Sequence, residues 1–360
     1  MKIIDKYILK RYLTNFFVML AMFIPIGIIV DVSEKIGRMV ENKIPFSTIA
    51  MYYFNFTIYF ANLLFPIFLF LSIIWFTSKL SNNTEIIAIL SSGISFSRFM
   101  RPYLIGATIV SILAFLMGIF ILPKASEGFN NFRYNYLTPG GIEKMRKNSD
   151  VFRQISKDEY IYVGSFNDVS KMAFNFSYEK FKKDELQFKI TASRIKWNPI
   201  NKNYTLFEYT KRTLGEFEDK IEVTSKKDTV FSFDLEDLTP TVYVAETLPL
   251  LDLYHFIDKE KKRGSSNIST YLVVLYKKYS LPVSAFILTI IALAVSSMKR
   301  RGGMGINLAI GIAISFAFVF FDKIFGALAE KSAINPMVAV WLPNVLFGIL
   351  AILLLRNAKR

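Results

Sequence analysis

The residue types that most often carry out catalysis are scarce in this chain. Its 360 residues include a single histidine, His255, and no cysteine. A nucleophile, a base and an orienting acid cannot be assembled around one histidine, so His255 is expected to be a surface or packing residue. The sequence also lacks the Cys and His clusters that bind structural zinc and the G-x-x-x-x-G-K-[ST] loop that binds nucleotide phosphates. It therefore favours a protein that is not an enzyme and binds no metal or cofactor, and any ATP would be used by a partner.

Six stretches without Asp, Glu, Lys or Arg are long enough to cross a lipid bilayer. A helix rises about 1.5 Å per residue, so about 20 apolar residues span about 30 Å of hydrocarbon. Five of the stretches have 19 to 24 residues. The second along the chain has 35 and is expected to be one span with an approach segment. Helices of a soluble core normally carry a polar face, which these lack. The stretches are 12–30, 44–78, 102–123, 279–298, 302–321 and 332–355.

The basic residues are concentrated in alternate segments, which predicts the orientation of the spans. Four such segments carry +11 of the formal net charge of +15, and the two short loops on the other side are neutral. Because Lys and Arg are retained on the cytoplasmic side, both termini are predicted to be cytoplasmic, and the basic balance gives no reason to expect nucleic-acid binding. The first span is expected to be retained, since no small-residue cleavage motif follows it. The basic segments are 1–11, 79–101, 299–301 and 356–360.

The block between the third and fourth spans has a different character. From Lys124 to Ser269 it holds 24 basic and 22 acidic residues, and short segments alternate apolar with polar residues. Such period-two runs predict antiparallel strands in a sandwich or jellyroll. A helix is expected from Pro249 to Arg263, with Gly264 beyond its end. The alternating runs are Tyr160–Val163, Phe174–Tyr178, Phe188–Thr191, Tyr204–Tyr209 and Val230–Phe233.

A short apolar segment lies between the second and third spans. Residues 82–85, Asn-Asn-Thr-Glu, are capping types, and Gly93 is expected to end the helix that they begin. The twelve uncharged residues 86–97 are too few to span a membrane. Such a helix could dock into a groove on a separate ATPase, or it could lie on the lipid surface, and its residues alone fit both interpretations.

Several short motifs, in order along nearly the whole chain, carry a resemblance to a known family. The sequence resembles the permease family of the lipopolysaccharide exporter, the LptF/LptG (YjgP/YjgQ) type. The β block matches that family only in character, apart from the segment from Glu246 to Gly264. The matching motifs are Ile4–Leu9, Pro66, Leu80-Ser81, Glu85–Ala88 with Gly93, Pro282, Arg300–Gly303, Asn335-Pro336 and Trp341–Asn344.

The resemblance implies a membrane α-helical fold of six transmembrane helices, three before and three after an inserted periplasmic all-β jellyroll-like domain. The implied domains are 1–123, with a coupling helix at about 82–94, then 124–270 and 271–360. The chain would be a permease subunit in the bacterial inner membrane, paired with a second LptF/LptG-type permease. A cytoplasmic ABC ATPase dimer would use the ATP, and periplasmic jellyroll bridge proteins would receive the lipopolysaccharide. The implied ATPase contacts are Glu85, Ile86, Ile87, Ala88, Leu90 and Gly93.

Basic side chains near the outer membrane boundary are the candidates for substrate binding. Lipid A carries phosphates, which Lys and Arg hold through charge-assisted hydrogen bonds. Each candidate could equally be an interfacial side chain that extends to lipid headgroups. The candidates are Lys35, Arg38, Lys277, Lys278 and Lys323.

Inward-facing aromatic residues of the β block offer a second candidate surface. They could line a groove for acyl chains or form the ordinary core of a sandwich, and alternation in the sequence does not distinguish a filled interior from an apolar conduit. These residues are Phe174, Phe176, Tyr178, Phe188 and Tyr204.

Two other functions remain open at this point. A lipoprotein-releasing permease would also use an ATPase, but that type usually has four spans with a large domain after the first. A membrane scaffold or sensor that transports nothing would need no coupling helix, so loss of ATPase binding would leave its activity intact.

Overall fold

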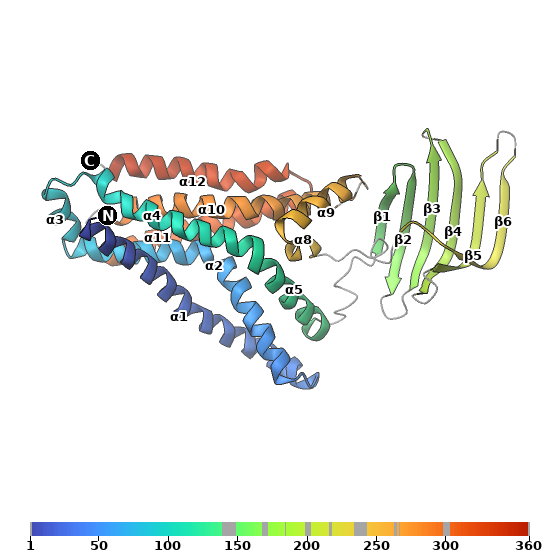
Figure 1. Cartoon of the computed structure of the whole chain (residues 1–360), viewed down its shortest axis with the longest axis horizontal. Coiled ribbons are helices and arrows are strands. Elements are labelled where there is room, and N and C mark those ends of the chain that lie inside the picture. Colours follow the sequence, from blue (N-terminus) through green and yellow to red (C-terminus); the bar gives the residue numbers. More distant parts are fainter. Residues whose placement is uncertain are drawn as a thin grey trace. The chain divides into compact units, whose positions relative to one another are not determined.

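The computed structural model consists of two compact units, each described here by itself (Figure 1). The helical unit holds residues 1–129 and 269–360, and the β unit holds residues 130–268. The described residues are 2–138, 149–167, 172–183, 185–198, 203–215, 218–233, 243–262, 265, 267–297 and 303–358.

Six long apolar helices confirm the six predicted spans. Three precede the strands and three follow them, and the third is interrupted by two short π-helical segments, η1 and η2. A short helix, α3, joins the second and third spans. The elements are α1 (Ile3–Glu41), α2 (Phe46–Asn82), α3 (Glu85–Ser91), α4 (Phe96–Leu116), η1 (Met117–Ile121), α5 (Leu122–Phe132), η2 (Arg133–Leu137), α10 (Ile268–Ser296), α11 (Gly303–Glu330) and α12 (Pro336–Ala358).

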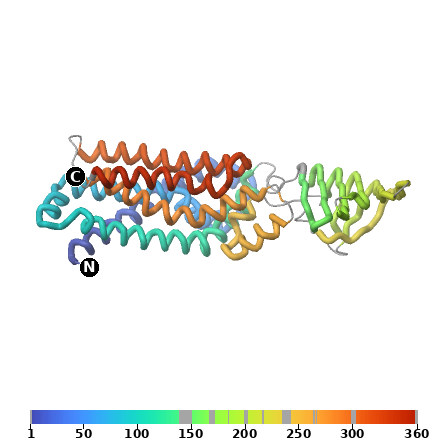
Figure 2. Tube along the Cα trace, turned by 90° about the horizontal axis from the view of Figure 1, so that it is seen from above, coloured from blue at the N-terminus to red at the C-terminus, as the bar shows by residue number. Residues whose placement is uncertain are grey.

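The helices extend well beyond the charge-free runs from which they were predicted. The run at 12–30 lies within α1, and the run at 44–78 belongs almost entirely to the single helix α2. Charged residues therefore do not mark where these helices end. The start of α1, α3 and the end of α12 lie together at one end of the helical unit, which we call the α3 end (Figures 1 and 2).

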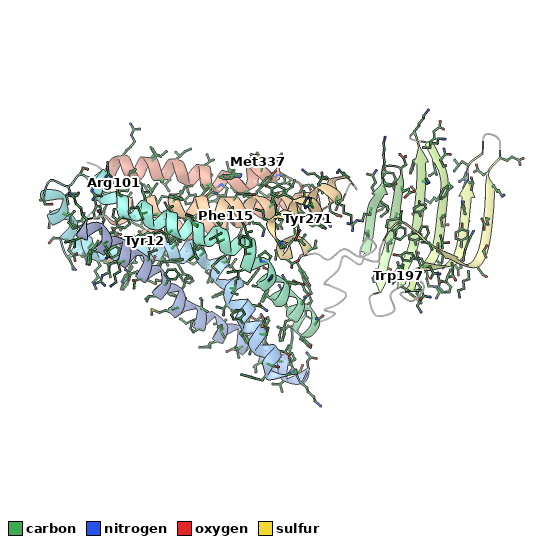
Figure 3. All side chains as sticks on the ribbon, in the orientation of Figure 1. Tyr12, Arg101, Phe115, Trp197, Tyr271 and Met337 are labelled. Atoms are coloured by element: carbon green, nitrogen blue, oxygen red, sulfur yellow. The ribbon has the colours of Figure 1, made fainter. Side chains whose placement is uncertain are left out.

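One apolar cluster, the helical core, holds the transmembrane helices together. It includes Tyr12 of α1, Leu69 of α2, Tyr103 of α4 and Leu288 of α10, all of them buried. Tyr12 is labelled in Figure 3, where it lies among neighbouring helices. In the apolar segment of α10 that is long enough to span a membrane, 61% of the residues are buried. In the corresponding segment of α1, 11% are buried. Thus α10 is the central helix, and most of α1 remains open to lipid or to another chain.

The predicted all-β insertion is confirmed, but its described strands form one sheet. The sheet has six antiparallel strands in the order β1-β2-β3-β4-β5-β6, so each strand pairs with its neighbours in the sequence. A sandwich or jellyroll would divide the strands between two sheets. The strands are β1 (Ser149–Ser156), β2 (Glu159–Asn167), β3 (Met172–Lys182), β4 (Glu185–Asn198), β5 (Asn203–Thr213) and β6 (Lys220–Thr229).

In the middle of the sheet, the alternation of inward and outward side chains is interrupted in strands β3 and β5. In β3, Ala173 and Phe176 are both buried, and Asn175 between them has a φ of 53°. Glu208 has a φ of 54° at a similar break in β5. The usual spacing of two residues between inward side chains therefore becomes three at these positions. Phe174 falls outside the buried core, so the prediction that it points inward is wrong.

Four of the five predicted strand segments lie within strands β2 to β5. The fifth, Val230–Phe233, is not a strand, because pairing of β6 ends at Thr229. The aromatic rings of this segment instead pack against the inner face of the sheet. Trp197 of β4, labelled in Figure 3, belongs to the same aromatic group through its contact with Tyr204.

Two helices follow the strands, α8 (Val244–Thr247) and α9 (Leu250–Lys262). The helix predicted from Pro249 corresponds to α9, although Arg263 and Gly264 lie outside the described residues. A buried ion pair between Arg153 of β1 and Glu260 fixes α9 to the sheet. His255 is exposed on α9, which agrees with the expectation of a surface residue.

Candidate functional site

The α3 helix is short and bounded by residues with unusual backbone conformations. Thr84 precedes it with a φ of 61°, and Gly93 follows it with a φ of 85°. A positive φ is readily adopted by glycine, so Gly93 can end the helix as predicted. The capping differs in detail from the prediction, since Asn82 ends α2 and the Asn83 side chain donates to the Glu85 carboxylate at 3.2 Å.

The predicted ATPase contacts are divided between two sides of α3. Ile86 is only 2% exposed and belongs to the helical core, so its side chain anchors α3 to the bundle. Ile87 is 51% exposed, and Ala88 and Gly93 are exposed as well. Glu85 and Leu90 are half-buried. The apolar surface that α3 presents to its surroundings therefore centres on Ile87.

Two polar contacts tie the start of α1 to α3 and α4. The Tyr7 hydroxyl donates to the Glu85 carboxylate at 3.5 Å. The Arg98 guanidinium of α4 donates to the Asp5 carboxylate at 2.6 Å, and Asp5 also accepts from the backbone N–H of Lys2 at 2.9 Å. Asp5 was not predicted to be functional, although an acidic residue in a basic N-terminal segment was a visible signal. The ion pair thus joins α1 to α4, and the longer Tyr7–Glu85 contact joins α1 to α3.

The opposite end of the helical unit, which we call the far end, holds charged side chains in close contact. The carboxylate of Asp31, buried in α1, accepts from the Lys35 ammonium and from the Tyr52 hydroxyl of α2, the latter at 3.0 Å. Tyr53 donates to the same carboxylate at 3.4 Å. The substrate candidate Lys35 is therefore paired with Asp31, whereas Arg38, one turn further along α1, is exposed.

The other candidate cations belong to α10 and α11. Lys277 forms an ion pair with Asp322 of α11 at 3.2 Å. Lys278 donates to the backbone carbonyl of Gly118 at 2.9 Å, and Gly118 lies in the π-helical segment η1. Wide helical turns of this kind occur often at functional sites. Lys323 is exposed, next to Asp322.

The candidate cations of the far end lie on different helices. Its cations come from α1, α10 and α11, and the acids that neutralise two of them were not themselves predicted as site residues. Their proximity could not be seen in the sequence, because Asp322 and Lys277 are far apart along the chain. Among the described residues, no group of three or more His, Asp or Glu side chains is placed to hold a metal ion.

These features define a class of protein. Three membrane-spanning helices, an inserted β unit, three further spans and a short exposed helix at one end are the architecture of a polytopic membrane protein with a large extramembrane insertion.

The sequence matches the family described as lipopolysaccharide export system permease LptF/LptG over residues 6–357. The chain therefore belongs to the LptF/LptG permease family, which is a family of transport proteins. No curated protein matches the sequence.

Proposed function

We propose that this chain is a permease subunit of an ATP-driven exporter that extracts lipopolysaccharide from the outer leaflet of the inner membrane. It would pass the lipid to a periplasmic bridge that leads toward the outer membrane. The observation that carries this proposal is the family match, which covers nearly the whole chain, including the β unit. The chain would bind no cofactor itself.

The α3 end supplies the support for ATP-driven coupling. An ATPase would need a rigid, exposed contact whose movement reaches the spans. Ile87 offers an exposed apolar side chain, while Ile86 on the same short helix is buried in the helical core. The long Tyr7–Glu85 contact between α1 and α3 adds a weak polar link to this anchor. We therefore favour docking of a cytoplasmic ABC ATPase dimer at α3.

The far end supplies the support for a phosphorylated lipid as the cargo. Charged side chains near the membrane boundary are costly to bury and usually serve ion or substrate handling. Arg38 and Lys323 are exposed, Lys35 lies on α1 with Arg38, and Lys277 and Lys278 lie on α10 beside Asp322 of α11 and the Gly118 carbonyl. Because α1 buries so little of its surface in this chain, it could line a lateral opening or contact a second LptF/LptG-type permease.

The orientation follows from the distribution of charge. The basic segments 1–11, 79–101, 299–301 and 356–360 would lie in the cytoplasm. In this orientation α3 would lie on the cytoplasmic side with the ATPase, and the β unit would lie in the periplasm with the bridge proteins.

Affinity purification in mild detergent, followed by protein and lipid mass spectrometry, tests the proposal. The wild-type chain should co-purify with a second six-span permease, an ATPase and lipid A species. Ile87→Asp should lose the ATPase alone, because it places a charge on the exposed apolar surface of α3. The matched control is Ile3→Asp, since Ile3 is 88% exposed at the same end but lies outside α3.

Two results would contradict the proposal. Recovery of the chain alone with ordinary phospholipid would favour a membrane scaffold. An ATPase that remains bound to Ile87→Asp as tightly as to Ile3→Asp would remove α3 as its docking site.

A further inference from the structure

The segment Val230–Phe233, which we call the strap, is the part of the β unit least like a permanent element of the sheet. It follows β6 directly but has no strand pairing. The Phe231 ring lies 5.8 Å from Phe176, 5.2 Å from Tyr178 and 5.9 Å from Tyr204, measured between ring centroids. Phe231 therefore contacts two strands, β3 and β5, through its side chain.

The second aromatic ring of the strap repeats this arrangement. Phe233 lies 5.1 Å from Tyr204 and 6.0 Å from Phe176, and it stacks on Phe231 at 4.8 Å. Contacts of this kind hold rings together through apolar area and weak ring–ring attraction. They impose little directional demand, so another apolar group could replace the two rings of the strap.

Polar contacts to the strap are few and long among the described residues. The Tyr204 hydroxyl donates to the Phe233 carbonyl at 3.3 Å, and the Ser232 hydroxyl donates to the Glu159 carboxylate at 3.3 Å. Both distances lie beyond the usual range for O–H···O hydrogen bonds. Val230 at the start of the strap is 74% exposed. The strap is thus held mainly by its two aromatic rings.

Glu159 keeps its charge at the edge of this contact. Burial alone would raise the pKa of Glu159, but hydrogen bonds from Lys180 and Tyr178 outweigh it and hold the pKa below its usual value. Lys180 donates to Glu159 at 3.0 Å, so the carboxylate stays in place without the strap. Loss of the Ser232 contact would therefore leave no unpaired buried charge.

The surface beneath the strap is apolar and aromatic. Phe176 and Tyr204 are each 1% exposed and Tyr178 is 7% exposed. Without the rings of Phe231 and Phe233, these side chains would form an exposed aromatic patch on the inner face of the sheet. Water wets such a patch poorly, whereas a hydrocarbon chain covers it favourably.

We propose that the strap is a displaceable cover, which occupies the aromatic inner face of the β unit until acyl chains of lipopolysaccharide take its place. The cargo class follows from the family to which the chain belongs, so this inference rests on the proposed function. Displacement exchanges one set of apolar contacts for another and breaks two long hydrogen bonds. The strap thereby keeps the face covered between cargo molecules.

A reversible lock on the strap provides the test. The natural sequence has no cysteine, so Glu159→Cys with Ser232→Cys introduces a unique thiol pair, which a short bis-methanethiosulfonate linker can join. Ser232 is exposed and reachable by the reagent. A photoreactive phenylalanine analogue at Phe188, which lies 5.9 Å from Tyr178, reports lipid on the inner face. The same analogue at Ile29, 64% exposed on α1, reports lipid at the helical unit.

The full chain is studied in spheroplasts of cells that express it with its natural partners, with crosslinked lipopolysaccharide detected by antibody. We expect crosslinking at position 188 to be lost when the strap is linked and to return after reduction, whereas crosslinking at position 29 persists throughout. The unlinked double-cysteine protein should behave like the reduced one, which controls for the substitutions.

The outcomes separate this inference from the proposed function. Equal crosslinking at position 188 with the strap linked or free overturns the inference, as does crosslinking at position 29 with none at 188 in either state. Absence of lipopolysaccharide crosslinks at both positions overturns the proposed function as well.

Discussion

The helical core and the far end of the same unit differ in the kind of polar contact that they contain. In the core, some hydroxyl side chains pair with each other inside an apolar cluster, as those of Tyr12 and Thr289 do at 3.1 Å. Thr77 and Tyr103 form a similar pair at 3.0 Å. At the far end, acidic and basic side chains such as Asp31 and Lys35 pair with each other instead.

This difference indicates a division of labour between the two regions. A close-packed core resists deformation and can transmit force between the helices that it joins. Cargo handling at the far end, as proposed, would require a paired cation to exchange its acidic partner for an anionic group of the ligand. The contrast supports the proposal that movement enters near α3 and that cargo is handled at the far end.

The largest expected effect on stability comes from placing a side chain at a closely packed glycine of the core. A Cβ on Gly106 of α4 would lie 2.7 Å from the Tyr12 ring, so Gly106→Leu must separate α4 from α1. We expect a loss of about 2–3 kcal/mol in the free energy of unfolding, in the upper part of the usual range for overpacked cores. Thermal unfolding of the purified chain in detergent measures it.

The matched control for this change lies at the far end. Gly37 of α1 has no atom within 4 Å of an added Cβ, so Gly37→Leu should leave stability nearly unchanged. Equal losses for the two variants would break the comparison, because the far end would then be as closely packed as the core.

A smaller effect is expected from the buried far-end ion pair. Asp31→Asn leaves the ammonium of Lys35 without its counter-charge and weakens the hydrogen bonds from Tyr52 and Tyr53. We expect a loss of about 1.5–2 kcal/mol in the free energy of unfolding, at the lower end of the range for hydrogen bonds to charged groups. The double variant Asp31→Asn/Lys35→Met should recover part of it in the same unfolding measurement. If the two substitutions were simply additive, Asp31 and Lys35 would not act as a pair.

The ion pair at the α3 end should matter slightly less. Asp5→Asn removes the charge that Arg98 contacts, and Arg98 remains 28% exposed to solvent. We expect a loss of about 1 kcal/mol. Glu34→Gln on the same helix is the control, since Glu34 is exposed. A loss no greater than that of the control would show that Asp5 does not hold α1 against α4.

The smallest effect is expected at Lys277 and Asp322. Both side chains are about a third exposed, at 32% and 28%, so solvent screens their attraction. We expect Asp322→Asn to change the free energy of unfolding by less than about 1 kcal/mol. If Asp322→Asn lowered the free energy of unfolding as much as Asp31→Asn does, solvent screening would not weaken the Lys277–Asp322 pair as we expect.

Much of the helical unit could be predicted from the sequence, because charge-free runs report the hydrocarbon directly. The helix ends could not, since α10 begins well before the charge-free run at 279–298 and includes Lys277 and Lys278. A charge ends a hydrophobic run but not a helix. The pairing of those lysines with Asp322 and with the Gly118 carbonyl depends on packing between segments distant in the sequence.

The β unit shows where alternation fails as a guide. Strand β6 is exposed along most of its length, so it carries no inward and outward pattern to detect. The strap has the same alternation as a strand, because its rings face the sheet in the same way that strand side chains do. Asn175 reverses the pattern within β3 through a positive φ, which no period-two argument anticipates.

The most direct test of the account is ATP-driven release of lipopolysaccharide from proteoliposomes that contain the full chain with its co-purified partners. The account predicts ATP-dependent transfer by the wild type and by Ile3→Asp, and transfer by Ile87→Asp no greater than in the absence of ATP. Transfer by Ile87→Asp at the wild-type rate would contradict coupling through α3. Absence of ATP-dependent transfer by the wild-type assembly would contradict the proposed function itself.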